Sequence, residues 1–210
     1  MNNGYSIKIN SLVFYKISGN ASVGVQIGSG CLNVIIYNSI FVENCSGGAI
    51  YSDNNNAKYV NCTFVNNRSN GVSPAGIYNW NDPKDTVINC IIYSNRNASG
   101  KQYAQLTFGH YIYHSDIEDK DSGGIYQIIG DTINVIDKAP LFEYQKDSVN
   151  LYPAGADGVW FTKDDGLRLQ SGSPCREKGN FFTWIPAFDI LGRTRPNENY
   201  PDIGAYEYYQ

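Results

Sequence analysis

The chain has 210 residues, 42% hydrophobic and 17% charged, which is enough to build the core of one elongated domain. Its net charge of −4 and isoelectric point near 5.1, with no cluster of basic residues, argue against a nucleic-acid partner. No apolar run approaches the roughly 18 residues of a membrane span, and the first five residues lack the charged and apolar regions of a signal peptide.

A tetrapeptide that begins with asparagine recurs along the first half of the chain, with successive copies 28, 23 and 28 residues apart. The copies are Asn10-Ser11-Leu12-Val13, Asn38-Ser39-Ile40-Phe41, Asn61-Cys62-Thr63-Phe64 and Asn89-Cys90-Ile91-Ile92. A unit that recurs in this way, with a variable length, is typical of the turns of a solenoid.

A second series of apolar residues runs in parallel with the tetrapeptides, and small residues usually precede each member. The series is Val25, Ile50, Ile77, Leu106 and Ile125. No segment shows a sustained apolar period of 3.6, so we expect few helices. Short apolar runs bounded by Asn, Gly, Ser and Asp predict short strands instead.

These patterns predict an all-β fold, a right-handed single-stranded parallel β-helix. A turn of roughly 22–28 residues is too small to bury its own core, but stacked turns place equivalent residues in ladders. Asparagine suits the corner because it tolerates the left-handed conformation and its amide can bond the next coil. His114 takes the asparagine place in the last coil of the set. The residues after the corner predict a small column and an apolar core column, the latter being Val13, Phe41, Phe64, Ile92 and Ile117.

The regular repeats end near residue 115, which divides the chain into two expected parts. Coils should occupy residues 1–130, and an irregular cap or module should occupy residues 131–210 and pack on the helix. The repeats begin by Asn10 without an evident cap, and an uncovered solenoid end exposes its core and strand edges. We therefore expect that further N-terminal coils belong to a longer parent chain.

Four motifs in the second part carry a resemblance to a known family. They are residues 137–142 (DKAPLF), residues 157–169 (DGVWFTKDDGLRL), the step from Ser173-Pro174 to Gly179, and Asp202–Glu207 (DIGAYE). The chain resembles the C-terminal part of bacterial surface β-helix proteins of the pectin-lyase-like superfamily, which end in a "choice-of-anchor" module. The last motif is matched in full, whereas Cys175-Arg176-Glu177 departs from the family's pattern. The resemblance implies export and an extracellular or cell-surface location; the superfamily includes polysaccharide lyases and hydrolases.

Candidate catalytic carboxylates follow the second apolar series on the loops. They are Asp53, Asp82 and Asp85. A lyase that acts on acidic polysaccharides needs a base, usually Lys or Arg, near a Ca²⁺ bound by carboxylates or near another cation that neutralises the substrate's acid group. A hydrolase needs two carboxyl groups about 5–9.5 Å apart. The sequence shows no tight cluster of carboxylates and bases, so solvated loop charge is the favoured interpretation. His110 and His114 are interpreted as ladder or packing residues.

An aromatic pattern gives a better binding signal. Tyr51, Tyr78 and Trp80 follow the second apolar series, and Trp80 lies in a turn-forming stretch rich in Asn and Asp. Aromatic faces beside polar groups suit sugar rings. The alternative is that the tyrosines form an outward ladder and Trp80 covers an adjacent edge.

Asp157, Asp164 and Asp165 lie among glycines in the second part of the chain. Such hard oxygen ligands suit Ca²⁺, although the spacing is not that of an EF-hand. The alternative is a structural loop of Asx-turns. Cys62 and Cys90 occupy equivalent ladder positions, where a small buried residue is favoured over a disulfide between coils.

The sequence as a whole predicts a non-catalytic secreted or cell-surface module that binds carbohydrate or serves as a structural stalk. The alternative is a C-terminal fragment of a polysaccharide lyase or glycoside hydrolase. A polysaccharide is the expected partner, with no nucleic acid and no membrane insertion.

Overall fold

The computed structural model describes residues 7–19, 23–31, 33–53, 56–80, 85–98, 105–107, 110–120, 134–143, 145–146, 150–151 and 153–210. Its strands are short because each coil turns after three or four residues. They are β1 (Ile7–Asn10), β2 (Val13–Tyr15), β3 (Val25–Ile27), β4 (Val34–Tyr37), β5 (Ile40–Val42), β6 (Ile50–Ser52), β7 (Lys58–Val60), β8 (Thr63–Val65), β9 (Ile77–Asn79), β10 (Thr86–Ile88), β11 (Ile91–Tyr93), β12 (Tyr111–Tyr113), β13 (Asp116–Ile117), β14 (Gln145–Lys146) and β15 (Asn150–Leu151).

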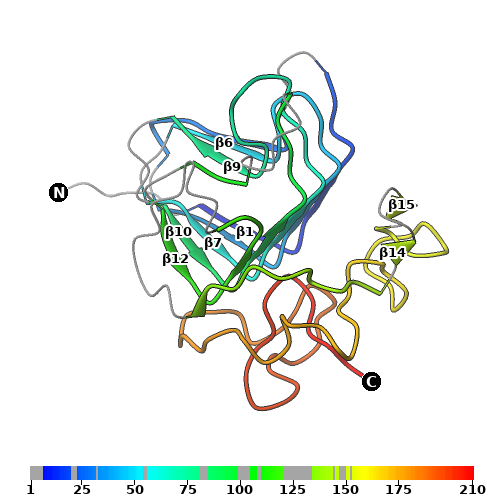
Figure 1. Ribbon diagram of the computed structural model, residues 1–210. Helices are drawn as coiled ribbons and strands as arrows, with labels where there is room; N and C mark the ends of the chain where they lie inside the picture. The colour runs from blue at the N-terminus through cyan, green and yellow to red at the C-terminus, as the bar shows by residue number, and fades with distance from the viewer. Residues whose placement is uncertain are drawn as a thin grey trace.

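Three parallel sheets line the coils. Sheet A has the order β1-β4-β7-β10-β12, sheet B the order β13-β11-β8-β5-β2, and sheet C the order β3-β6-β9. Each neighbour in a sheet comes from the next coil, and every pair in these sheets is parallel. Seen close to end-on, the coils form a stacked tube, with β6 and β9 on one side and β7, β10 and β12 on another (Figure 1). The predicted parallel β-helix is confirmed.

The asparagine corner lies between sheets A and B. Asn38, Asn61 and Asn89 have φ values of 41°, 51° and 51°, the left-handed conformation that asparagine tolerates. Their amides form a ladder in which each Nδ2 donates to the Oδ1 of the previous coil. The distances are 3.2 Å from Asn38 to Asn10, 3.3 Å from Asn61 to Asn38 and 3.1 Å from Asn89 to Asn61. The predicted ladder is therefore present.

The register of the first coil differs by one residue from the register that the repeated tetrapeptides predict. Asn10 pairs with Tyr37, so Ser11 (φ 54°) holds the left-handed position of this corner. The prediction that Val13 belongs to the inner column is wrong, because Val13 pairs with Ile40 and faces outward. The inner position belongs to Phe14. The alignment failed because consecutive apolar residues follow the corner and the tetrapeptide alone does not fix the alternation of faces.

The core consists of columns that run through the coils. The rings of Phe14, Phe41 and Phe64 are stacked with centroids 4.7 and 4.8 Å apart, the separation of neighbouring strands. The column continues with Ile92 and Ile117. In sheet C the second apolar series forms a column as expected, from Val25 to Leu106. Its expected last member, Ile125, lies outside the described residues.

A second amide ladder, which the sequence analysis missed, lies inside the coils after sheet B. Asn44 donates to Asn67 (2.9 Å), Asn67 donates to Asn95 (2.8 Å), and Asn95 donates to Gln105 (2.7 Å). Gln105 in turn donates to Glu118 at 2.7 Å. Each donor here bonds the next coil along the chain, opposite to the corner ladder. The signal was an asparagine six residues after each of the last three corner asparagines.

The C-terminal segment packs on the outer face of sheet B (Figure 1). Its apolar side chains form one cluster with the outward residues of the sheet, among them Ile40, Val42, Val65, Ile91, Leu167, Leu169, Ile203 and Tyr206. The segment also contacts the corner ladder. Asn89 exchanges two hydrogen bonds with the backbone of Asn180, and Asn38 donates to the carbonyl of Phe188. The division at residue 130 stays a prediction.

Candidate functional site

The predicted aromatic residues gather on the outer face of sheet C. Tyr51 and Tyr78 are register partners on β6 and β9, and both point outward because their strand neighbours are buried. Their rings meet edge to face with centroids 5.5 Å apart, and Trp80 continues the strip at 6.1 Å from Tyr78. Trp80 is 65% exposed. We call Tyr51, Tyr78 and Trp80 the aromatic strip; the structure brings all three together.

Polar groups border the aromatic strip on one side. Asp53 follows β6 directly and is half-buried, and its backbone N–H donates to the carbonyl of Ile27. Burial, followed by the charge of Asp53, raises the pKa of Tyr51. The strip thus combines ring faces with a carboxylate at its edge, the combination that a sugar ring requires.

The three candidate catalytic carboxylates have different surroundings. Asp85 is fully buried, and its carboxylate accepts hydrogen bonds from the Ala57 N–H (2.9 Å), the Asn79 amide (3.0 Å) and the Tyr59 hydroxyl (3.2 Å). This geometry supports a structural role for Asp85, since a catalytic carboxyl must reach the substrate. Asp82 lies outside the described residues. The interpretation of Asp53 and Asp82 as solvated loop charge stays a prediction, with a catalytic role as its alternative.

Both histidines contact the packed body of the protein. His110 is fully buried, with its Nε2 atom 2.9 Å from the Thr107 hydroxyl, and burial lowers its pKa to about 4. His114 holds the corner with φ 46°, and its Nδ1 atom lies 3.3 Å from the carbonyl oxygen of Lys178. This geometry supports the interpretation of both as ladder or packing residues.

The acidic loop at residues 157–165 uses its carboxylates to bind its own backbone. Asp164 accepts from the N–H groups of Ala156 and Asp157, and Asp157 accepts from Val159. Asp165 accepts from the Phe161 N–H and from the hydroxyl of Tyr206 at 2.6 Å. Of these contacts, the one from Val159 to Asp157 is that of an Asx-turn, and the others tie the carboxylates to earlier parts of the loop and to Tyr206. Within the described part of the chain no group of three His, Cys, Asp or Glu side chains could hold a metal. The calcium site stays a prediction.

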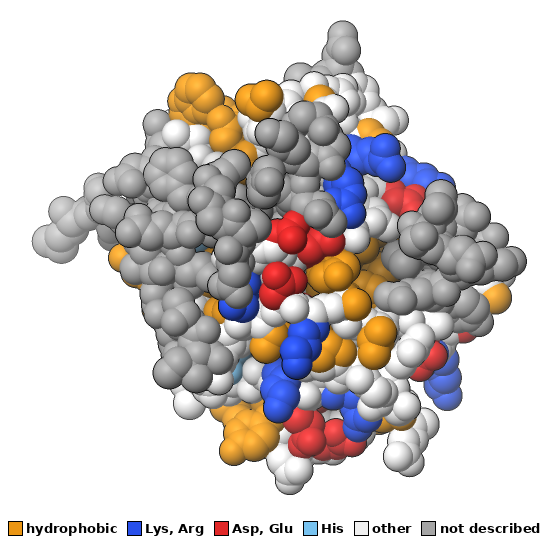
Figure 2. Space-filling view, viewed as in Figure 1, with side chains coloured by type: hydrophobic (Ala, Val, Ile, Leu, Met, Phe, Trp, Pro, Cys, Tyr) orange, Lys and Arg blue, Asp and Glu red, His pale blue; other side chains and the backbone are white. Residues whose placement is uncertain are grey.

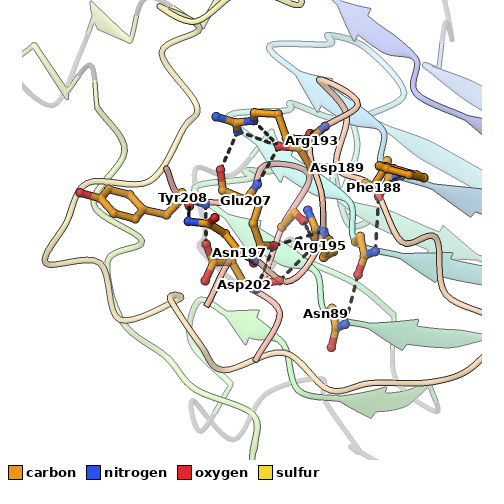
Figure 3. A network of polar contacts seen from close by, with 12 residues as sticks. Asn89, Phe188, Asp189, Arg193, Arg195, Asn197, Asp202, Glu207 and Tyr208 are labelled. Carbon is orange, nitrogen blue, oxygen red and sulfur yellow. Dashed lines mark hydrogen bonds and ion pairs between the residues drawn. The ribbon is translucent and has the colours of Figure 1, made fainter. Parts of the chain in front are cut away.

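The terminal motif Asp202–Glu207 fixes the C-terminal segment to the coils. Gly204 has φ 106°, and a Cβ atom there would lie 2.8 Å from Ile91. Its neighbour Ala205 donates to the Thr63 hydroxyl at 3.0 Å. Figure 3 shows the charged network beside the motif. In it Arg195 Nε lies 3.3 Å from Glu207 Oε2, with both side chains 1% exposed. The role of Arg195 could not be predicted from the sequence, because nothing local distinguishes a buried arginine from an exposed one.

The cysteines are all free, and Cys62 and Cys90 are buried beside the corner. On the face seen in Figure 2, acidic and basic side chains are interspersed with apolar ones. None of the described segments forms a helix long and apolar enough to cross a membrane.

The buried carboxyl groups predict that stability falls as the pH rises. Burial raises the pKa of Asp116 and of Glu207 to about 7 and that of Asp85 to about 6. The folded state therefore binds these protons more tightly than the unfolded state. This contribution to stability is fully present below about pH 4 and is lost as the pH rises to about 7. His110 opposes this trend, since its lowered pKa costs stability as the pH falls from 6.5 to 4. The effect of the three carboxyl groups on the free energy of unfolding is larger than the opposing effect of His110.

We expect the free energy of unfolding to be lower at pH 8 than at pH 5 by ~2–4 kcal/mol, because one pKa unit corresponds to ~1.4 kcal/mol. Urea titrations at the two pH values measure the difference. Asp116→Asn should flatten the dependence, because Asp116 contributes one of the largest shifts. Greater stability at pH 8 than at pH 5 would contradict this account.

Comparisons with known proteins give one remote similarity. No family model matches the chain, and no curated protein matches it. Among solved structures, the crystal structure of pectate lyase Pel9A is similar with 14% identity and a TM-score of 0.43. The alignment covers 96% of this chain and 65% of that one, so the chain spans less than two thirds of that enzyme. This similarity is too remote to support an argument about activity. The strand pairing confirms the parallel β-helix, while the "choice-of-anchor" assignment stays a prediction.

Proposed function

We propose that the protein is a non-catalytic module, secreted or held at a cell surface, whose aromatic strip binds carbohydrate. The observation that carries this proposal is the alignment of Tyr51, Tyr78 and Trp80 along one outer face, with Trp80 65% exposed. An indole that is exposed to this extent contributes little to the stability of the fold, because most of its apolar surface stays in water. A sugar ring stacked on it would bury that surface.

The geometry also bounds the strength of binding. The strip lies on the outside of a sheet, so it can contact only one side of a glycan and buries little of it. We therefore expect dissociation constants from roughly 10 mM to 100 µM for a single site, unless several sites act together. A glycan chain that runs along the helix would contact the rings of successive coils.

Replacing Trp80 with alanine should abolish glycan binding, because the most exposed ring of the strip is removed. The measurement is an NMR titration with a panel of neutral and acidic oligosaccharides. Phe188→Ala is the matched control, since Phe188 is 56% exposed but lies on the C-terminal segment. Unchanged binding by Trp80→Ala would contradict the role of the strip. Absence of binding across the panel would favour a structural stalk.

The same panel tests the alternative of a polysaccharide lyase or glycoside hydrolase fragment. Asp53 borders the strip, which places one carboxylate where a bound glycan would lie. Release of unsaturated or hydrolysed products, lost in Asp53→Asn or Asp82→Asn, would replace the non-catalytic proposal with the enzymatic one. We expect no product release.

A further inference from the structure

An uncharged aromatic loop, residues 179–188, lies along the outside of the asparagine corner. Its sequence is GNFFTWIPAF, in which none of the side chains is charged. The Asn180 N–H donates to the side chain of Asn89 at one end, and the Phe188 carbonyl accepts from Asn38 at the other. These two corner asparagines are two coils apart, so the loop runs along the tube, where it is drawn in orange in Figure 1. One side of the loop therefore faces the coils and the other faces solvent.

The coils fix the loop from its inner side. Phe182 and Ile185 pack against the buried cluster of Tyr37, Val60 and Ile88. The Ile185 N–H donates to the Phe182 carbonyl at 2.9 Å, which closes a tight turn between these two residues. Because the ends, the turn and the inward side chains are all held, the outward side chains have defined positions before any partner binds.

The outward side of the loop exposes large apolar rings. Phe181 is 52% exposed and Phe188 is 56% exposed, at opposite ends of the loop. Tyr200 is also exposed and extends the surface beside Phe181, with ring centroids 6.1 Å apart. Trp184 is exposed between the two phenylalanines, although other side chains already contact part of its ring. We call Phe181, Trp184, Phe188 and Tyr200 the aromatic ridge. A gathering of exposed apolar rings marks a contact surface.

The charges around the aromatic ridge favour an anionic partner. Lys178 is exposed directly before the loop, and the ammonium group of Lys58 lies 5.1 Å from the ring centroid of Trp184. Three flanking carboxylates are bonded to other side chains: Asp189 to Arg193, Glu198 to Arg176, and Glu177 to Asn199. The arginines neutralise two of these carboxylates, so the two lysines outweigh the one that remains.

We propose that the aromatic ridge binds to the surface of an anionic lipid bilayer. The rings of Phe181 and Phe188 enter the boundary between headgroups and acyl chains, where aromatic side chains are favoured. Lys58 and Lys178 pair with lipid phosphates. The loop goes no deeper than this boundary, because its backbone polar groups need partners. No segment crosses the bilayer, so this contact differs from the membrane insertion that the sequence argues against. The helix axis lies along the membrane, because the ridge runs along the coils.

The composition of the ridge favours a bilayer over a glycan or a second protein. A glycan site combines rings with hydrogen-bonding side chains, but the loop offers only Asn180 and Thr183, and the Asn180 oxygen accepts from the Phe181 N–H at 2.8 Å. Four half-exposed rings supply roughly 300–500 Å² of contact surface. A stable protein interface needs ~800 Å² from each partner. A fluid bilayer, in contrast, takes up each ring separately.

The test is co-sedimentation with two kinds of vesicle, one of phosphatidylglycerol and phosphatidylcholine in equal parts and one of phosphatidylcholine alone. The unmodified chain should bind the mixed vesicles more tightly, by roughly three-fold or more. The double variant Phe181→Ala, Phe188→Ala should weaken binding to the mixed vesicles by roughly ten-fold or more, since both inserted rings are lost. Lys178→Met should reduce the difference between the two vesicles.

A further variant guards against a loss of binding that is caused by misfolding. Thr183→Glu places a carboxylate at an exposed position of the turn and removes none of the inward side chains. It should weaken binding to the mixed vesicles by roughly three-fold or more while its thermal melt stays that of the unmodified chain. Unchanged binding by this variant and by the double phenylalanine variant would overturn the proposal.

Two control variants test whether the contact is specific to the aromatic ridge. Phe161→Ala removes an exposed ring from the acidic loop, and Trp80→Ala removes the ring of the aromatic strip; both should leave vesicle binding unchanged. An equal loss in Phe161→Ala would overturn the proposal, as would an absence of binding to the mixed vesicles. A dimer seen by sedimentation velocity, abolished by the double variant and accompanied by no vesicle binding, would assign the ridge to a contact between copies and overturn it as well. None of these results bears on glycan binding by the strip, which Trp80→Ala tests separately.

Discussion

Replacing Asn67 with leucine should lower the free energy of unfolding by ~3–5 kcal/mol. The Asn67 side chain is fully buried, and its amide donates to Asn95 Oδ1 at 2.8 Å and to the carbonyl of Phe41 at 2.9 Å. Its oxygen accepts from the backbone and side chain of Asn44. Leucine would leave the Phe41 carbonyl and the Asn44 N–H without these partners in a dry interior, and each such loss costs ~1–3 kcal/mol.

Two comparison variants make the Asn67 experiment specific. Asn61→Leu, in the corner ladder, should cost only ~1–3 kcal/mol, because its side chain makes one bond to each neighbouring asparagine and, among the residues that the structure describes, none to a strand carbonyl. Asn70→Leu, at an exposed position, should change stability by less than ~0.5 kcal/mol. Chemical denaturation measures all three. If the Asn67 variant is at least as stable as the Asn61 variant, the inner ladder contributes little to the stability of the fold.

The coils were predictable from the sequence because each residue of a coil contacts its equivalent in the next. Repetition therefore reveals the structure, and the corner at Asn38, Asn61 and Asn89 appears in the sequence as a periodic residue. The register of the first coil was not predictable in this way. Its corner places Ser11 in the left-handed position, and the stacking of Phe14 on Phe41 fixes the alternation. The tetrapeptide is compatible with two strand registers that differ by one residue, and side-chain packing selects one of them.

The C-terminal segment was less predictable, because its contacts are distant in sequence and occur only once. The Ala205 N–H donates a hydrogen bond to the hydroxyl of Thr63, which is 142 residues away in the sequence. No repeat in the sequence predicts such a pair. The terminal motif was recognised, but its physical role as the contact with sheet B came only from the structure. The aromatic strip was predictable because Tyr51 and Tyr78 alternate with buried residues. The inward orientation of Asp85 was not, since it depends on Tyr59 and Asn79 of neighbouring strands.

Truncation of Arg195 to alanine should destabilise the protein by ~3–5 kcal/mol, the usual cost of leaving one member of a buried ion pair alone. Arg195 Nη1 donates to the carbonyls of Asp202 (3.1 Å) and Gly204 (3.0 Å), and the guanidinium faces the carboxylate of Glu207. Without Arg195, the terminal motif loses the cation that neutralises Glu207 and holds two of its carbonyls. We expect the C-terminal segment to detach from sheet B first, which hydrogen exchange at Gly204 and Ala205 would detect.

The effect of Arg195→Ala should also depend on pH in a way that a simple loss of packing would not. Burial raises the pKa of Glu207 to about 7, so at pH 5.5 the carboxyl is largely protonated and carries little uncompensated charge. At pH 8 it is ionised beside Arg195, whose charge lowers its pKa. Without the arginine the site must hold either a lone carboxylate or a carboxyl that stays protonated at pH 8, and both cost free energy. The loss of stability should therefore be larger at pH 8 than at pH 5.5. Arg176→Ala is the matched control, because its pair with Glu198 is partly exposed and worth ~1 kcal/mol or less. Equal losses for Arg195→Ala at the two pH values would mean that the arginine acts through its carbonyl contacts and packing alone, with no contribution from the charge of Glu207.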